Sequence, residues 1–236
     1  TSAGAGAAAA WEDVSGGISF KSEGTNFTDS LLVGHSTTGT LNAAQKNTGV
    51  GIDAMDALTS GDNNTAVGYQ AGTAITSGYN NIAIGLDALL AASTAFNNIA
   101  IGAGAGSTMS TSTQQNVLLG TQAGKVVTGS HNICLGNESG EALSSGAGNV
   151  LIGNGIEAAS NSGDQQLKIA GNNESSTVNW IIGDSSGNLT FPADVTLGDD
   201  LLLDSDSCVL KFGDDQDVTL THTDGTGLTL NSTSKL

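Results

Sequence analysis

A pattern of hydrophobic and polar positions recurs along most of the chain with a period of about 17 residues. In each unit an aliphatic residue directly precedes a glycine, a polar residue stands four positions before that glycine, and a small residue stands three positions after it. The glycines are Gly34, Gly51, Gly68, Gly85, Gly102, Gly120, Gly136 and Gly153. The aliphatic residues are Val33, Val50, Val67, Ile84, Ile101, Leu119, Leu135 and Ile152. The polar positions are Ser30 and then Asn47, Asn64, Asn81, Asn98, Asn116, Asn132 and Asn149. A fixed period of this length is typical of a solenoid in which each unit forms one coil.

Each unit has the sequence features of one short β-strand followed by turns. In NIAIG at 81–85, Ile82 and Ile84 are two residues apart, so their side chains lie on the same face of a strand. We expect one such Val or Ile to be buried in each coil, together with the small residue after the glycine and a later Ala-Leu pair such as Ala57-Leu58. The sequence Thr-Ser-Gly at 59–61 predicts a turn that leads to the next asparagine.

A single coil of this kind cannot be stable alone, because its few small apolar side chains do not offset roughly 1–2 kcal/mol of backbone entropy per residue. The coils must therefore stack, with neighbouring strands about 4.8 Å apart and parallel. Val67, Ile84 and Ile101 should then lie in vertical register, and the asparagines of neighbouring coils should form a ladder of amide hydrogen bonds. We predict an all-β fold, a parallel β-roll or β-solenoid of 17-residue repeats.

Composition narrows the function classes. Glycine accounts for 34 of 236 residues and aromatic residues for 4%, which is typical of a thin core. The net charge is -17, with six lysines and no arginine, so we expect neither nucleic acid nor an anionic membrane as a partner. The chain has no run of 18 apolar residues, which argues against membrane insertion.

The repeat sequences NTAVGYQA, NIAIGLDA and NIAIGAGA resemble the head repeats of trimeric autotransporter adhesins. Those heads are left-handed parallel β-rolls in which three chains pack side by side. The resemblance implies the same fold and a homotrimer for residues 29 to about 156.

The array is more similar to tail-fibre and other appendage proteins of marine bacteriophages, which carry similar repeats written NNTAVG and TSG. Two further segments, Leu167–Phe191 and Leu210–Leu230, also resemble those proteins. The resemblance implies a structural component of a phage fibre, in the tail or a capsid appendage, that serves as a rigid spacer in host attachment. The implied partners are two further copies, other tail or capsid proteins of the virion, and a glycan or protein receptor on the host surface. The alternative is a bacterial trimeric surface adhesin or extracellular filament subunit, and a glycan-degrading tailspike is a minor alternative.

Four regions follow from these patterns. We expect a lead-in or connector at 1–28, the repeat shaft at 29–160, a connector with a β-hairpin at 161–191, and an acidic module of short strands at 192–236. The hairpin should join Ser176–Ile182 to Asn188–Phe191 through a turn at 183–187. The short strands of the last module are expected near Val195–Leu197, Leu201–Leu203, Val209–Phe212, Val218–His222 and Leu228–Leu230.

No residue pattern predicts catalysis, and we expect no catalytic, cofactor-binding or metal-binding residues and no enzymatic activity. Gly102, Gly104 and Gly106 fall at a repeat position and lack the helix that a phosphate-binding loop requires. The histidines His35, His131 and His222 lie in unrelated segments without metal-ligand spacing. Cys134 and Cys208 form neither a metal nor a disulfide pattern, and Cys134 has the repeat phase of a small core residue.

Three weaker alternatives remain. The acidic clusters Asp199-Asp200, Asp204–Asp206 and Asp214–Asp217 could bind Ca²⁺ where three chains meet, although solvated turn carboxylates explain them better. The carboxylate pairs Glu138 with Glu141 and Asp53 with Asp56 would suit a glycosidase, but they lie in repeat turns. Paired hydroxyls such as Thr59-Ser60, Thr76-Ser77, Ser93-Thr94 and Ser110-Thr111 would stack as in ice-binding solenoids, although a role in the turn before glycine is preferred.

Overall fold

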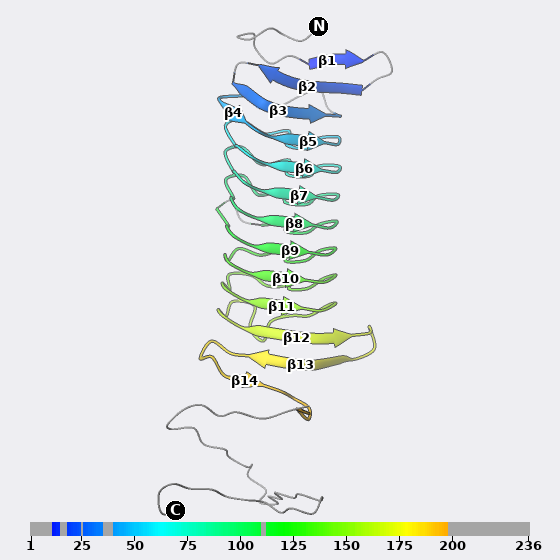
Figure 1. Ribbon diagram of the computed structural model, residues 1–236, viewed down its shortest axis with the longest axis vertical. Coiled ribbons are helices and arrows are strands. Elements are labelled where there is room, and N and C mark those ends of the chain that lie inside the picture. Colours follow the sequence, from blue (N-terminus) through cyan, green and yellow to red (C-terminus); the bar gives the residue numbers. More distant parts are fainter. Residues whose placement is uncertain (1–10, 15–17, 25, 35–39, 110–111, 198–236) are drawn as a thin grey trace, which may run out of the picture. The chain divides into compact units, whose positions relative to one another are not determined.

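The computed structural model describes residues 11–14, 18–24, 26–34, 40–109 and 112–197 (Figure 1). The chain divides into two compact units, Thr1–Asp194 and Val195–Leu236. In the first unit the described residues form a 14-stranded sheet, and no helix occurs among them. The strands are β1 (Trp11–Val14), β2 (Ile18–Gly24), β3 (Phe27–Val33), β4 (Ala44–Gln45), β5 (Thr48–Val50), β6 (Thr65–Val67), β7 (Ile82–Ile84), β8 (Ile99–Ile101), β9 (Val117–Leu119), β10 (Ile133–Leu135), β11 (Val150–Ile152), β12 (Leu167–Asn172), β13 (Thr177–Gly183) and β14 (Leu189–Thr190).

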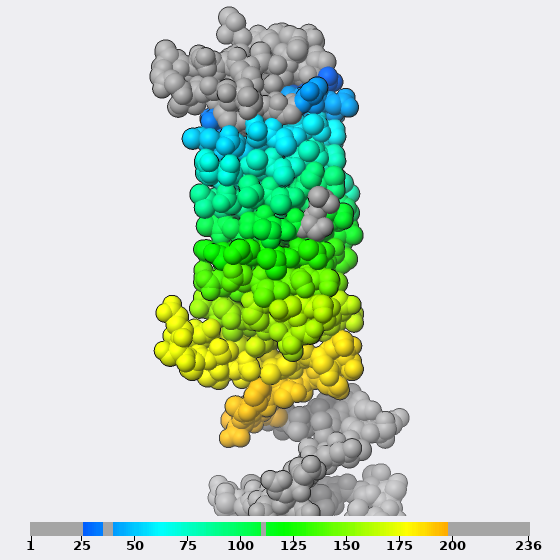
Figure 2. Space-filling view, turned by 180° about the vertical axis from the view of Figure 1, so that it is seen from behind, coloured from blue at the N-terminus to red at the C-terminus, as the bar shows by residue number. Residues whose placement is uncertain are grey.

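The predicted solenoid is confirmed. Strands β3 and β5 to β12 pair in parallel, one strand per repeat, and residues one repeat apart are partners, as in Val67 with Ile84 and Ile84 with Ile101. Hydrogen bonds also join neighbouring coils in the turns: Gln70 N donates to Ile52 O at 2.9 Å, and Met55 N donates to Ala71 O at 3.0 Å. In Figure 2 the successive coils form layered bands along the long axis. Because the coils are bonded around their perimeter, the stack is a continuous rod rather than a chain of separate modules.

Both ends of the stack differ from its middle. At the N-terminal end β1, β2 and β3 pair antiparallel, so strands occupy part of the segment that we expected to be a connector. At the C-terminal end the parallel ladder continues through β12, past position 160 where we placed the end of the shaft. Strands β13 and β14 then pair antiparallel around residues 183–189, which agrees with the predicted hairpin.

The acidic short-strand module lies almost entirely outside the described residues. Its first predicted strand, Val195–Leu197, falls on residues that form no strand in the structure, so that prediction is wrong. The other predicted strands of this module and the lead-in at 1–10 lie outside the described residues.

The core of each coil contains the middle residue of its strand, which corrects one expectation. Ala83 and Ala100 are completely buried, whereas the isoleucine that follows each of them, Ile84 or Ile101, is partly exposed. Side chains along a strand alternate between two faces, so only one face can point into so narrow a coil. The small residue occupies the interior, and the pair of β-branched residues lies outside. The completely buried middle residues are Leu32, Ala66, Ala83, Ala100, Leu118, Cys134 and Leu151.

Large and small side chains compensate for each other within the thin core. Ala83 is paired in its coil with the large Leu89, whereas Leu118 is paired with Gly124 at the corresponding position. A methyl group added to Gly124 would lie only 3.1 Å from Cδ1 of Leu118 and 3.2 Å from Cγ2 of Val127. In these two coils the core therefore has room for one large residue at one of the two positions, which fits the close packing of protein interiors.

A glycine follows β3 and each of the strands β5 to β11, and these glycines form one corner of the stack. Gly68 has a φ of +136°, and a Cβ atom there would lie 2.6 Å from the carbonyl oxygen of Gly85 in the next coil. Both the backbone conformation and the contact exclude a side chain.

Candidate functional site

One face of the stack is apolar along its length, and we call it the apolar face. It consists of the first and last residues of each three-residue parallel register. These residues flank a middle residue, which is buried in β3 and in β5 to β11. Its members are Leu31, Val33, Thr48, Val50, Thr65, Val67, Ile82, Ile84, Ile99, Ile101, Val117, Leu119, Ile133, Leu135, Val150, Ile152, Leu167 and Ile169. All but Thr48 and Thr65 are aliphatic, and none is charged. Val50 is 42% exposed and Ile101 is 39% exposed, so these side chains meet solvent instead of the core.

A second apolar column borders this face in the N-terminal half of the stack. The residue directly after the corner glycine is Ile52, Tyr69 and Leu86 in three successive coils, and these side chains are 57%, 47% and 52% exposed. In later coils the same position carries Thr121 and Asn137. The apolar surface is therefore wider near the N-terminal end than near the C-terminal end.

The sequence also indicates which side of each strand is buried. Asn81 and Ala83 are two residues apart and so lie on the same side of the strand, opposite Ile82 and Ile84. A buried asparagine ladder therefore requires a buried Ala83 and an exposed isoleucine pair. The asparagines of the ladder are buried as predicted, from Asn47 to Asn149.

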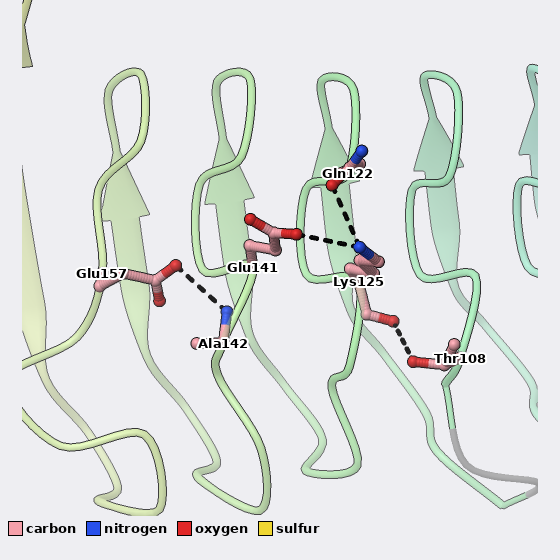
Figure 3. A network of polar contacts seen from close by, with 6 residues as sticks. All are labelled: Thr108, Gln122, Lys125, Glu141, Ala142 and Glu157. Carbon is pink, nitrogen blue, oxygen red and sulfur yellow. Dashed lines mark hydrogen bonds and ion pairs between the residues drawn. The ribbon is translucent and has the colours of Figure 1, made fainter. Parts of the chain in front are cut away.

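A polar network lies on the turns that follow the strands (Figure 3). Lys125 Nζ donates to Gln122 Oε1 at 3.2 Å and forms an ion pair with Glu141 Oε1 at 3.0 Å. Thr108 Oγ1 donates to the carbonyl oxygen of Lys125 at 2.9 Å, which fixes the backbone at this point. The network joins three successive coils on one side of the stack.

Glu157 extends this network toward the C-terminal end. Its Oε1 accepts a hydrogen bond from Ala142 N at 3.1 Å, while its Oε2 is buried and has no hydrogen-bond partner. Burial raises the pKa of the Glu157 carboxyl above its usual value, and the nearby Glu141 carboxylate acts in the same direction. The Ala142 N–H and the Lys168 ammonium oppose this shift.

The residues considered for nucleotide or glycosidase chemistry do not assemble into a site. Gly102 is a corner glycine, and a Cβ atom added at Gly106 would lie 3.0 Å from Leu118 Cδ1 and from Leu89 Cδ2 in the core. Glu141 is engaged with Lys125, while Glu138 is exposed. The rings of Tyr79 and Phe96 stack on each other with centroids 4.8 Å apart.

The hydroxyl pairs bond between coils. Thr59 Oγ1 donates to Thr76 O at 3.0 Å, and Thr76 Oγ1 lies 2.9 Å from Ser93 Oγ. These hydroxyls therefore take part in holding the turns together, whereas Ser110 and Thr111 lie outside the described residues.

Cys134 is a core residue, as predicted. It is completely buried and unpaired, and burial raises the pKa of its thiol to about 12. His131 lies exposed in a turn. The other predicted residues of interest, His35, His222, Cys208 and the acidic clusters after position 198, lie outside the described residues.

Over the described ranges, no three His, Cys, Asp or Glu side chains are grouped as metal ligands. That part of the chain also contains no helix long and apolar enough to span a bilayer.

The fold and these surfaces define a parallel β-solenoid with one apolar face and polar turns. No protein family, curated protein or solved structure matches the chain in comparisons with known proteins. The geometry of the solenoid therefore carries the functional argument.

Proposed function

We propose that this chain is the shaft of a phage fibre, a rigid non-enzymatic spacer in host attachment that three copies build by packing side by side. The observation that carries the proposal is the uncovered apolar face, which runs from β3 to β12 without a charged side chain.

The size of the apolar face is that of an interaction surface. At about 4.8 Å per coil the distance from β3 to β12 is about 38 Å, and a strip about 10 Å wide gives roughly 400 Å² in plan. The largest apolar patch on a typical monomer is about 300–600 Å² and is often functional. Ile52 and Tyr69 of the second column widen the patch toward the roughly 800 Å² per partner of a stable interface.

A second copy of the same chain fits this face best. Two parallel copies present their coils at the same spacing, so the Ile82–Ile84 pair of one meets an equivalent pair of the other at every level. The net charge of -17 would oppose association if it lay on the contact surface, but acidic residues such as Asp53, Asp87 and Glu138 lie in the turns. Each aliphatic side chain that moves from water into the interface contributes up to about 1.5–3 kcal/mol, scaled by the exposed fraction it buries.

A rod of this construction suits a spacer. Hydrogen bonds between coils run along the whole stack, so bending it requires many bonds to lengthen together. The anionic turns keep the exterior solvated and repel other anionic surfaces.

Labelling of particles tests the biological role. Antibodies raised against the chain should label an appendage of phage particles in electron micrographs and reduce adsorption to host cells. Labelling of bacterial cell surfaces in the absence of phage would instead favour the adhesin or filament alternative. Release of reducing sugars from host polysaccharide by the purified fibre would favour the tailspike alternative.

A further inference from the structure

A hollow in the turn surface arises because one coil carries small side chains between two coils that carry larger ones. Ala103, Gly104 and Ser107 occupy this coil, and the hollow that they leave has a volume of about 250 Å³. The hollow is thus a local departure from the repeat and not one of its regular features.

The coil before it supplies an apolar wall and one acceptor. Leu86 and Leu90 line the hollow from positions equivalent to Ala103 and Ser107. Asp87 also lines it, and the Oδ1 atom of Asp87 is buried with no hydrogen-bond partner. Buried polar atoms are nearly always paired, so this carboxylate has an unused capacity to accept a hydrogen bond.

The coil after it supplies a polar wall that is held in place. Thr121, Gln122 and Lys125 line this side of the hollow. The Lys125 ammonium uses two of its three N–H groups on Gln122 and Glu141, as Figure 3 shows, and the third can serve a ligand. Because the lysine is already oriented, less side-chain entropy is lost when it binds a further group.

These walls suit a small ring with one apolar side and a rim of hydroxyl groups. Leucine side chains on one wall can cover ring C–H groups, while the carboxylate, amide and ammonium can bond the hydroxyls. A divalent cation does not fit, because Asp87 is the only carboxylate among the described residues that line the hollow, and Ca²⁺ requires six to eight oxygen ligands. The charge of the chain disfavours anions, so the ring should be uncharged.

We propose that this hollow binds one pyranose ring of a neutral saccharide. The saccharide would be the ligand in the host attachment proposed above. Only its source, a polysaccharide of the host surface, rests on that proposed function.

A substitution that fills the hollow tests the proposal. Gly104→Gln places a side chain at a backbone position with a φ of +68°, and the equivalent Asp87 and Gln122 already occupy this conformation at 56° and 55°. A Cβ atom at Gly104 meets only Gln122 Cγ at 3.4 Å and Ser107 Oγ at 3.9 Å, so the coil can accept it.

The matched control is Gly148→Gln. Gly148 has the same φ of +68°, and a Cβ atom there meets nothing closer than 3.5 Å, but the residue does not line the hollow. Ala103→Leu is a second filling variant that reproduces the Leu86 of the preceding coil and needs no positive φ.

The probe is a panel of neutral methyl pyranosides of the glucose, galactose, mannose and N-acetylglucosamine types, measured by ligand-observed NMR on the assembled protein. We expect at least one to bind, with at least a tenfold loss of affinity in Gly104→Gln and Ala103→Leu and no change in Gly148→Gln. Absence of binding to the unmodified protein, or equal binding by all variants, would overturn the assignment of the hollow. Neither result affects particle labelling, which tests the shaft role separately. If the protein binds a sugar but antibodies against it label no phage particle, only the proposed source of the sugar is refuted in this proposal.

Discussion

Asn64 donates two hydrogen bonds to the same atom of Asn47, its Oδ1: one from the backbone N at 3.0 Å and one from Nδ2 at 3.1 Å. The second Nδ2 proton of Asn64 goes forward to the carbonyl oxygen of Gly78, at 2.8 Å. Each buried amide thus bonds the coil before it and the coil after it. Ser30 begins the ladder by accepting from Asn47 N at 2.8 Å, and Gln166 ends it by donating from its backbone N to Asn149 Oδ1 at 2.8 Å.

This ladder predicts a large effect for an interior member. In Asn81→Ala the backbone N of Asn98 loses its acceptor, and Asn64 Oδ1 loses one of its two donors. Asn98 Nδ2 also loses the bond to Asn81 but keeps those to Phe96 O and Thr113 O. Leaving buried polar groups unpaired costs roughly 1–3 kcal/mol each. We expect the free energy of unfolding, measured in urea, to fall by at least about 2 kcal/mol.

The control is the neighbouring Asn80, which is exposed and has a φ of 56°. Asn80→Gly removes an exposed hydrogen bond to Asn97 without imposing backbone strain, so its effect should stay within about 1 kcal/mol. Equal losses for the two variants would show that the ladder does not stabilise the stack.

The glycine corner predicts a second pair of outcomes. Gly85→Ala forces a Cβ atom to within 2.6 Å of the Gly102 carbonyl oxygen at a φ of +131°, so the coils must separate locally. Gly148→Ala meets no atom closer than 3.5 Å. The midpoint temperature of thermal unfolding should drop by several degrees or more in Gly85→Ala and by much less in Gly148→Ala. A Gly85→Ala protein as stable as the Gly148→Ala protein would contradict the packing of this corner.

Glu157 predicts a pH dependence whose sign follows from its raised pKa. The folded state binds this proton more tightly than the unfolded state, so the contribution of Glu157 to stability is present below the unfolded pKa and is lost as pH rises through the folded pKa. Glu157→Gln removes this dependence. Its stability relative to the unmodified protein should therefore increase from about pH 4 to pH 7. A relative stability that stays constant or decreases over this range would be inconsistent with a desolvated carboxyl at this position.

The repeat made much of the fold predictable, but it was harder to predict which face of each strand is buried in the core. Gly68 and Gly85 set the period and the register, and Asn64 and Asn81 set the ladder, because each role needs one residue type. The strand Ile82–Ile84 is apolar on both faces, so hydrophobicity alone does not say which face is buried. Only the spacing does so, because Ala83 is two residues from Asn81 and therefore lies on the same, buried side of the strand.

The hollow was not visible as a motif. Ala103-Gly104 reads as an ordinary glycine-rich turn until it is aligned with Leu86-Asp87 before it and Thr121-Gln122 after it. Its lining comes from residues up to about 40 positions apart that only the stacking of coils brings together.

The central claim is that the apolar face packs against other copies of the chain, and sedimentation equilibrium at micromolar concentration tests it most directly. For the 23.3 kDa chain we expect a species of three times that mass, about 70 kDa. Ile84→Asp and Ile101→Asp together should convert it to monomer by placing charges in the interface, while Asp87→Asn and Glu138→Gln in the turns should leave the mass unchanged. A folded 23.3 kDa monomer of the unmodified chain, with the same stability as the double Asp variant, would contradict the account.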